Sequence, residues 1–121
     1  MANVLCVDDS PTMRKIISKS LRQSGLAVEE FFEAGDGFEG LAVIASGKKI
    51  DLILADINMP NMDGLEFVKA VRNNGNLLPI VMITSEGGDH IIEEAISIGA
   101  SDSIKKPFTP DQLQEKLGGY F

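Results

Sequence analysis

The sequence predicts an α/β protein in which a parallel β-sheet is covered by helices on both faces. Five short apolar segments alternate with five segments of helical periodicity, and this alternation is typical of strands joined by helical crossovers. The apolar segments are continuous, as in strands buried on both faces. Because such crossovers are right-handed, few topologies remain. We therefore predict a doubly wound (βα)5 three-layer sandwich.

The first strand and helix have distinct signals. Residues 3–7, NVLCV, form a continuous apolar run, which predicts a strand. Ser10 and Pro11 then supply a helix cap and a proline suited to the first helical position. Apolar residues recur at helical spacing as far as Ser24, and Gly25 is placed to end the helix.

The middle of the chain repeats this order. Residues 28–34 are predicted as the second strand and residues 36–46 as the second helix, which Gly47 closes. Residues 51–55, DLILA, are the third predicted strand, and residues 64–73 the third helix.

Two further units complete the pattern. Residues 79–83, PIVMI, are the fourth predicted strand, with the proline at the first position, where it removes no ladder hydrogen bond. Residues 89–98 are the fourth helix, residues 101–104 a short fifth strand, and residues 109–117 the last helix.

Length and composition predict that residues 1–121 form a single domain. The net charge of −7 argues against nucleic acid as a partner. No apolar run reaches the roughly 20 residues that span a bilayer, and the start has no pattern of a signal peptide. Cys6, the only cysteine, has no internal disulfide partner and is expected in the core. A cytoplasmic protein is the resulting expectation.

Polar residues follow four of the five predicted strands. Asp8 and Asp9 follow the first, Asp56 the third, Thr84 with its neighbouring serine the fourth, and Lys106 with its neighbouring lysine the fifth. The carboxyl ends of parallel strands meet at one edge of the sheet, where ligands bind in this class of fold. We therefore expect these side chains to converge.

The expected cluster has the chemistry of a magnesium site. Three neighbouring carboxylates repel one another unless a cation compensates their charge. Hard oxygen ligands without nearby histidine or thiolate favour Mg²⁺. An aspartate beside Mg²⁺, an amine and a hydroxyl has the groups needed for phosphoryl transfer onto its own carboxylate.

Four motifs in order, VDDSPTMR, LADINMPNMDG, MITSE and IKKPFT, closely resemble the receiver domain of two-component response regulators. The resemblance extends over the whole chain and is greatest to the stand-alone receivers of chemotaxis. It implies a flavodoxin-like fold with the parallel sheet order 2-1-3-4-5.

The resemblance also implies a role for each carboxylate. Asp56 would accept a phosphoryl group from a sensor histidine kinase. Asp9, Asp56 and the backbone carbonyl of Asn58 would ligate Mg²⁺, and Asp8 would act on the metal through water.

The remaining implied roles concern the phosphoryl group and the output. Thr84 and Lys106 would each contact a phosphoryl oxygen, and the peptide bond before Pro107 would be cis. The domain would catalyse only its own phosphorylation and dephosphorylation, and would not otherwise be an enzyme. A monomer would signal to a downstream protein, such as a flagellar motor switch or a relay protein, and neither DNA nor a membrane would be a partner.

The chain departs from the family at two positions. Ile57 follows the expected phosphoacceptor, where chemotaxis receivers often have Trp, and Ser103 stands where the family usually has Tyr or Phe. In the family that ring reports the movement of the threonine to the output surface, so its loss puts this part of the switch in doubt. Gly87 and Gly88, close to Thr84, are expected to form a mobile loop.

Two other classes of protein are the alternatives to a receiver domain. A phosphohydrolase resembling the haloacid dehalogenases would have Asp-x-Asp after the first strand, whereas this chain has Asp8-Asp9-Ser10. A flavodoxin-like FMN carrier would need a phosphate-binding first loop and aromatic residues around the flavin ring. Asp8 and Asp9 would repel the phosphate, and the chain has no Trp.

Overall fold

A five-stranded parallel sheet lies at the centre of the protein, whose computed structural model describes residues 2–85 and 89–121. The strand order β2-β1-β3-β4-β5 confirms the predicted topology. The strands are β1 Ala2–Val7, β2 Val28–Ala34, β3 Leu52–Asp56, β4 Ile80–Thr84 and β5 Asp102–Lys105. The helices are α1 Pro11–Gln23, α2 Gly37–Ala45, α3 Gly64–Asn73, α4 Asp89–Ser97 and α5 Pro110–Leu117, followed by the 3-10 turn η1 Gly118–Tyr120.

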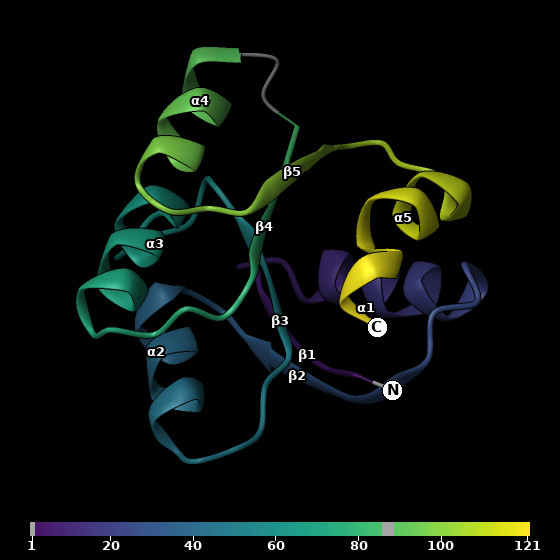
Figure 1. The fold of residues 1–121 in the computed structure, drawn as a ribbon, viewed down its shortest axis with the longest axis horizontal. Coiled ribbons are helices and arrows are strands. Elements are labelled where there is room, and N and C mark those ends of the chain that lie inside the picture. Colours follow the sequence, from purple (N-terminus) through teal and green to yellow (C-terminus); the bar gives the residue numbers. More distant parts are fainter. Residues whose placement is uncertain (1, 86–88) are drawn as a thin grey trace.

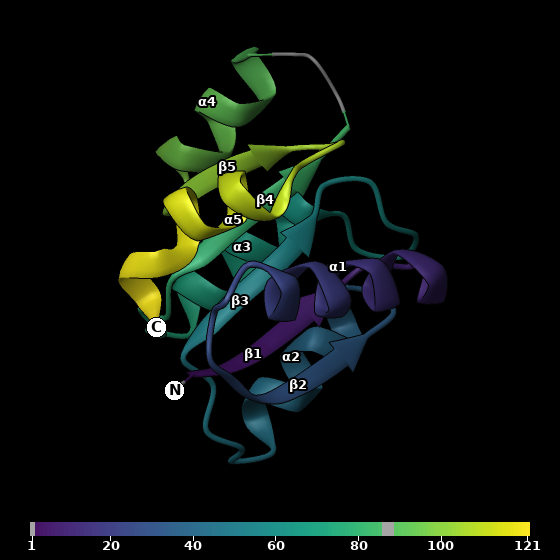
Figure 2. The same cartoon turned by 90° about the vertical axis from the view of Figure 1, so that its right-hand side faces the viewer.

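The helices cover both faces of the sheet, as expected of a doubly wound sandwich. Helices α1 and α5 lie on one face, and α2, α3 and α4 on the other (Figure 1). The view turned by 90° shows the same layers from the side of α1 and α5 (Figure 2). Each face has its own apolar core: Leu21 and Leu113 belong to one, and Phe67 and Val68 to the other. Cys6 is also buried, as predicted, and burial raises the pKa of its thiol.

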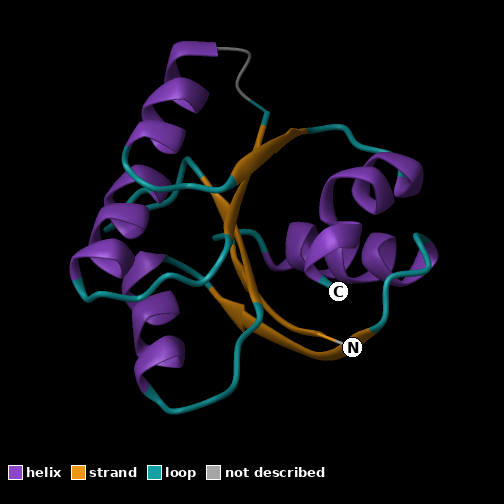
Figure 3. Cartoon of the chain, in the orientation of Figure 1, coloured by secondary structure: helices purple, strands orange, loops and turns teal. Residues whose placement is uncertain are grey.

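Helix starts lie at the carboxyl edge of the sheet and helix ends at the amino edge, because each of α1 to α4 follows one parallel strand and precedes the next. Figure 3 shows the helices, the strands and the loops that join them. At the carboxyl edge, where the strands end, α1, α2, α3 and α5 begin at the capping residues Ser10, Asp36, Asp63 and Thr109. Each capping side chain accepts a hydrogen bond from a backbone N–H in the first turn of its helix. Glycines with positive φ, Gly25, Gly47, Gly75 and Gly99, follow the helices at the amino edge.

Strand boundaries differ from the prediction by at most one residue. Strand β4 begins at Ile80 because Pro79 has no N–H for the ladder, although the carbonyl of Pro79 accepts a hydrogen bond from Ile53 N at 2.9 Å. At the other end the strand extends to Thr84, whose carbonyl accepts from Lys106 N at 2.8 Å. The strand is therefore shifted by one residue, which places Thr84 in the sheet itself, paired with Lys105 of β5.

Candidate functional site

The carboxyl edge brings together the polar residues that the sequence placed after separate strands. Asp8 directly follows β1, Asp56 ends β3 and Thr84 ends β4, and these strands are neighbours in the sheet. Asp8 is 2% exposed and Thr84 is 1% exposed. Lys106 follows β5, and Asp9 is exposed at the rim.

Three carboxylates form a cluster that can hold a cation. One carboxylate oxygen from each of Asp8, Asp9 and Asp56 lies within 4.8 Å of the others. Asp8 Oδ1 accepts a hydrogen bond from Ser10 N at 2.8 Å, whereas the buried Asp8 Oδ2 has no hydrogen-bond partner. A buried carboxylate oxygen is unfavourable unless it is compensated. The hard oxygen donors and this unsatisfied atom fit Mg²⁺.

Lys106 is the positive charge that faces the cluster. Its Nζ lies 3.6 Å from Asp8 Oδ2 and 3.8 Å from Asp56 Oδ2, and its side chain is 15% exposed. Both distances exceed those of a charge-assisted hydrogen bond. One amine between the buried carboxylate of Asp8 and the partly buried carboxylate of Asp56 therefore lowers their repulsion without forming a close pair with either.

The environment of Asp56 favours its protonated form. Burial is the largest cause of a raised pKa for this carboxyl group, and the negative charge of Asp8 raises that pKa further. The charge of Lys106 and the backbone N–H groups of Ile57 and Asn58 oppose the change. Ile57 N donates to Asp56 Oδ1 at 2.8 Å, so one carboxylate oxygen is held while the other faces Lys106. A cation at this site would favour the charged form.

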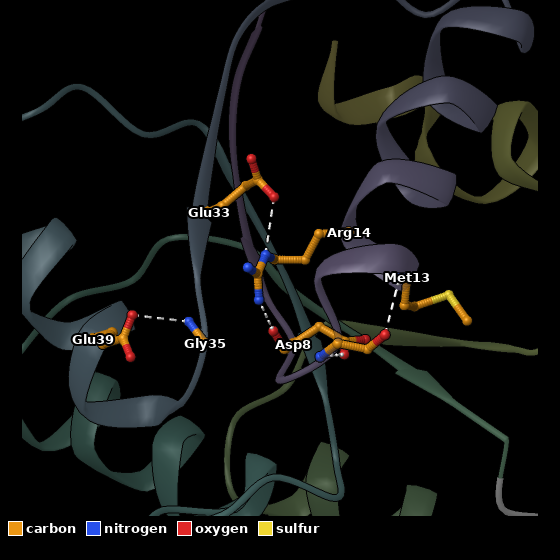
Figure 4. A network of polar contacts seen from close by, with 7 residues as sticks. Asp8, Met13, Arg14, Glu33, Gly35 and Glu39 are labelled. Atoms are coloured by element: carbon orange, nitrogen blue, oxygen red, sulfur yellow. Dashed lines mark hydrogen bonds and ion pairs between the residues drawn. The ribbon is translucent and has the colours of Figure 1, made fainter.

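Arg14 is a member of the site that sequence reasoning did not single out. Its Nη1 donates to the backbone carbonyl of Asp8, and its Nε pairs with Glu33 Oε1 at 2.9 Å. Figure 4 shows the guanidinium lying between these two residues. Arg14 thus ties the segment that carries Asp8 to β2. Its position in the VDDSPTMR motif, in the first turn of the helix that follows the aspartates, was the available signal.

The loop after β3 returns very close to the end of that strand. Gly64 N donates to Ile57 O at 2.7 Å. A Cβ at Gly64 would overlap the carbonyl oxygen of Asp56 and lie 2.7 Å from the Cα of Ile57. Only glycine fits this approach. Asn58, the residue whose carbonyl the family resemblance implies as a metal ligand, lies in this loop two residues after Asp56.

Other expectations about single residues have different outcomes. The Lys106–Pro107 peptide bond is cis, as the resemblance implied. Ile57, in place of the usual Trp, is 5% exposed and packs in the core on the α3 side. Ser103 is half-buried in β5. The expected mobile loop at Gly87 and Gly88 lies outside the described residues.

Comparison with known proteins shows which domain this chain resembles. A family model for the response regulator receiver domain matches residues 4–118. The chain is 42% identical over 116 residues to chemotaxis protein CheY1 of Helicobacter pylori, covering 94% of this chain and 92% of that protein. It is 40% identical to the chemotaxis protein CheY homolog of Campylobacter jejuni, covering 94% and 88%.

Solved structures show the same similarity. Chemotaxis protein CheY4 of Vibrio cholerae superposes with a TM-score of 0.85 and 40% identity, covering 100% of this chain and 99% of that chain. A probable two-component system response regulator/GGDEF domain protein has a TM-score of 0.87 and 30% identity. It covers 99% of this chain, which spans 49% of that protein.

Proposed function

Because the chain belongs to the response regulator receiver domain family, we propose that it is a phosphorylation-activated signalling receiver whose phosphoacceptor is Asp56. The observation that carries the proposal is the position of Asp56 at the end of β3, beside Asp8 and Lys106. We propose that residues 1–121 act as one such domain.

Asp9, Asp56 and the backbone carbonyl of Asn58 are the proposed ligands of Mg²⁺, with Asp8 acting through water. The spacing of the three carboxylates and the unsatisfied Asp8 Oδ2 support this assignment. Bound Mg²⁺ would neutralise carboxylate charge and the charge on the oxygens of an incoming phosphoryl group.

In the proposed reaction, the carboxylate of Asp56 attacks the phosphorus of a phosphohistidine on a sensor kinase. A P–O bond to Asp56 forms, the P–N bond to the imidazole breaks, and the released imidazole nitrogen takes a proton from solvent. Lys106 pairs with one phosphoryl oxygen and the hydroxyl of Thr84 donates to another. Attack by water on phosphorus later releases inorganic phosphate and restores the carboxylate.

The proposed output is a protein contact that depends on phosphorylation. The aspartyl phosphate adds charge at the end of β3, and Thr84 on the next strand can respond to it. Ser103 has no ring to follow that movement, so the signal would pass through Thr84 and the segment after β4. The receiver would act as a cytoplasmic monomer on a flagellar switch or relay protein, and the net charge of −7 does not favour DNA.

Treatment with acetyl phosphate and Mg²⁺ tests this function by intact mass. The wild type should gain one phosphoryl group, and labelling should be lost with EDTA and in Asp56→Asn. Asp51→Asn is the matched control because it changes the aspartate that precedes the same strand, and it should be labelled like the wild type. Continuous turnover of acetyl phosphate at an enzyme's rate would instead favour a hydrolase, and labelled Asp56→Asn would refute the assignment.

A further inference from the structure

The loop between β3 and α3 is attached to the start of α2 by one side-chain pair. Asn61 Nδ2 donates to Asp36 Oδ2 at 2.9 Å, across 25 residues of sequence. Asn61 has φ 68°, the only positive φ of a non-glycine residue in the described ranges. Asparagine tolerates this left-handed conformation better than most residues. The backbone at Asn61 is thus turned so that its side chain reaches the neighbouring element.

Asp36 divides its two carboxylate oxygens between two elements. Oδ1 accepts from Glu39 N at 2.9 Å and caps α2, while Oδ2 accepts from Asn61. Asp36 is 9% exposed, and these hydrogen bonds lower the pKa of its carboxyl group. It is therefore charged at neutral pH and accepts strong hydrogen bonds from both elements.

Close packing beside the pair shows that the loop lies directly on the first turn of α2. A Cβ at Gly37 would lie 2.6 Å from both Cγ and Sδ of Met62. Gly37 is buried. The missing side chain at Gly37 allows Met62 to approach, and the Asp36–Asn61 hydrogen bond lies next to this contact.

The same loop is closed at its base. Gly64 N donates to Ile57 O at 2.7 Å, so both ends of the loop meet beside the end of β3. Met62 N donates to Pro60 O at 2.7 Å within the loop. Asn58 therefore lies between a fixed base at Ile57 and the tethered Asn61. The Asp36–Asn61 hydrogen bond thus adds an attachment to a loop in which Met59 and Met62 also pack against the core.

We propose that Asp36 and Asn61 are positioning residues that hold the β3–α3 loop so that the carbonyl of Asn58 is presented to the carboxylate cluster. This inference rests on the proposed function, since it assigns the pair a purpose at the proposed magnesium site. Neither residue is proposed to touch the metal or the phosphoryl group. A hydrogen bond that orients a ligand from outside the ligand set commonly controls metal affinity.

Asp63, at the other end of the loop, differs from Asp36 in what it binds. Its carboxylate accepts from Glu66 N at 2.8 Å, and its own N–H donates to Glu66 Oε1 at 3.1 Å. Both hydrogen bonds of this capping box belong to the start of α3. An aspartate can therefore cap a helix without a hydrogen bond to a second element. The hydrogen bond from Asn61 to Asp36 is not needed for capping α2 and requires another explanation.

Three variants separate the positioning of the β3–α3 loop from the effect of net charge on Mg²⁺ binding. Asn61→Gly removes the amide, keeps the net charge and accepts the positive φ. Asn61→Asp places a carboxylate against Asp36, so the pair repels. The added charge alone would strengthen Mg²⁺ binding, whereas a displaced loop would weaken it. The double variant Asp36→Asn, Asn61→Asp restores a donor and an acceptor at the same net charge as the wild type.

Mg²⁺ affinity of the folded protein is the main measurement, by calorimetric titration with MgCl₂. We expect the dissociation constant to rise roughly tenfold in Asn61→Gly and in Asn61→Asp. The double variant should return to within about threefold of the wild type. Asn74→Gly is the matched control, because it makes the same substitution at the other end of α3. It should leave the dissociation constant unchanged.

Three further readouts exclude a purely structural role for the Asp36–Asn61 pair. The thermal midpoint in EDTA and the circular dichroism at the titration temperature should show each variant folded. The rate of labelling by acetyl phosphate should recover in Asn61→Gly at high Mg²⁺, which separates weakened metal binding from damaged chemistry.

The outcomes distinguish this inference from the proposed function. If the wild type binds Mg²⁺ and Asp9→Ala does not, but Asn61→Gly and Asn61→Asp bind as the wild type does, only the positioning role is wrong. Tighter binding in Asn61→Asp would also overturn it, because simple electrostatics would then suffice. If the wild type itself shows no saturable Mg²⁺ binding, the proposed metal site fails and the positioning role fails with it.

Discussion

Strand β3 has an aspartate beside each end, and the two lie in opposite environments. Asp51, just before the strand, accepts a hydrogen bond from Asn3 N through Oδ2 at 2.8 Å and donates its own N–H to Asn3 O at 2.8 Å. Asp56, at the last position, lies near Asp8 and Asp9, and its pKa is raised by burial and by Asp8. The first aspartate joins two strands, whereas the second adds charge to a site that already repels it.

The two edges of the sheet differ in the same way. At the amino edge, Arg72 donates from Nε and Nη2 to the carbonyl of Gly99, at 3.0 and 2.8 Å, and from Nη1 to Asn76 O at 2.9 Å. At the carboxyl edge, Asp8 Oδ2 has no hydrogen bond and Lys106 stands beyond hydrogen-bond distance from both carboxylates. The amino edge also has a buried polar atom without a hydrogen-bond partner, Asn3 Oδ1. The difference between the edges is therefore in charge: the neighbouring carboxylates gather at the carboxyl edge, as is common at functional sites.

Gly64→Ala is the change with the largest expected effect. The new Cβ would overlap the backbone at the end of β3, and we expect the free energy of unfolding to fall by about 3 kcal/mol or more, with loss of Mg²⁺ binding. Gly47→Ala at the amino edge meets no atom within 4 Å but has φ +84°, so about 1 kcal/mol is expected, with Mg²⁺ affinity unchanged. Urea unfolding and calorimetric titration measure both. If Gly64→Ala and Gly47→Ala lost equal stability, the backbone around residue 64 would have to shift and remove the overlap with the new Cβ.

Asp9→Ala and Asp8→Ala should weaken Mg²⁺ binding to different degrees. Loss of a proposed direct ligand should raise the dissociation constant roughly a hundredfold, and loss of a water-mediated contact roughly tenfold. Asp51→Asn, at the other edge, should leave the dissociation constant unchanged. Calorimetry with MgCl₂ decides the order, and a larger loss in Asp8→Ala would contradict the proposed roles.

Arg72→Lys tests the amino edge alone. The substitution keeps the charge but cannot reproduce three donors in one plane, so the free energy of unfolding should fall by about 1 to 2 kcal/mol. Mg²⁺ affinity and labelling by acetyl phosphate should stay at the wild-type level, because the side-chain hydrogen bonds of Arg72 go to Gly99 and Asn76 at the amino edge. Reduced Mg²⁺ affinity in the folded variant would mean that the two edges are coupled.

Asp56→Asn and Asp51→Asn should change stability in opposite directions. In EDTA at neutral pH we expect Asp56→Asn to raise the free energy of unfolding by about 1 kcal/mol, because it removes a partly buried charge that Asp8 repels. Asp51→Asn should lower the free energy of unfolding by a similar amount. The folded-state pKa of Asp56 is raised. The wild type therefore loses stability as pH rises from the ordinary carboxyl pKa through the higher folded pKa.

The pH dependence of the free energy of unfolding is the control for the comparison of Asp56→Asn with Asp51→Asn. The advantage of Asp56→Asn should disappear as the pH falls below the ordinary carboxyl range, because Asp56 is then protonated in both states. Added Mg²⁺ should stabilise the wild type and reduce or reverse the difference. A stabilising effect that is constant with pH would exclude charge as its cause.

The arrangement of strands and helices was predicted from sequence because its signals are local. Ser10 with Pro11 and Thr109 with Pro110 begin helices through hydrogen bonds that reach only three residues along the chain. The candidate site was predicted as a set of residues for a related reason: strand ends of a parallel sheet share an edge. The motif resemblance then assigned roles to members of that set, and those roles await the tests above.

Contacts between elements were decided only by tertiary structure. Asp36 and Asn61 are 25 residues apart, and Arg72 and Gly99 are 27 residues apart, so no short periodicity links either pair. The ion pair between Arg14 and Glu33, 19 residues apart, likewise depends on how α1 packs beside β2. Composition and spacing determine which chemistry reaches the edge of the sheet, because backbone geometry repeats. Packing determines which side chains then support it, because that depends on distances between segments far apart in sequence.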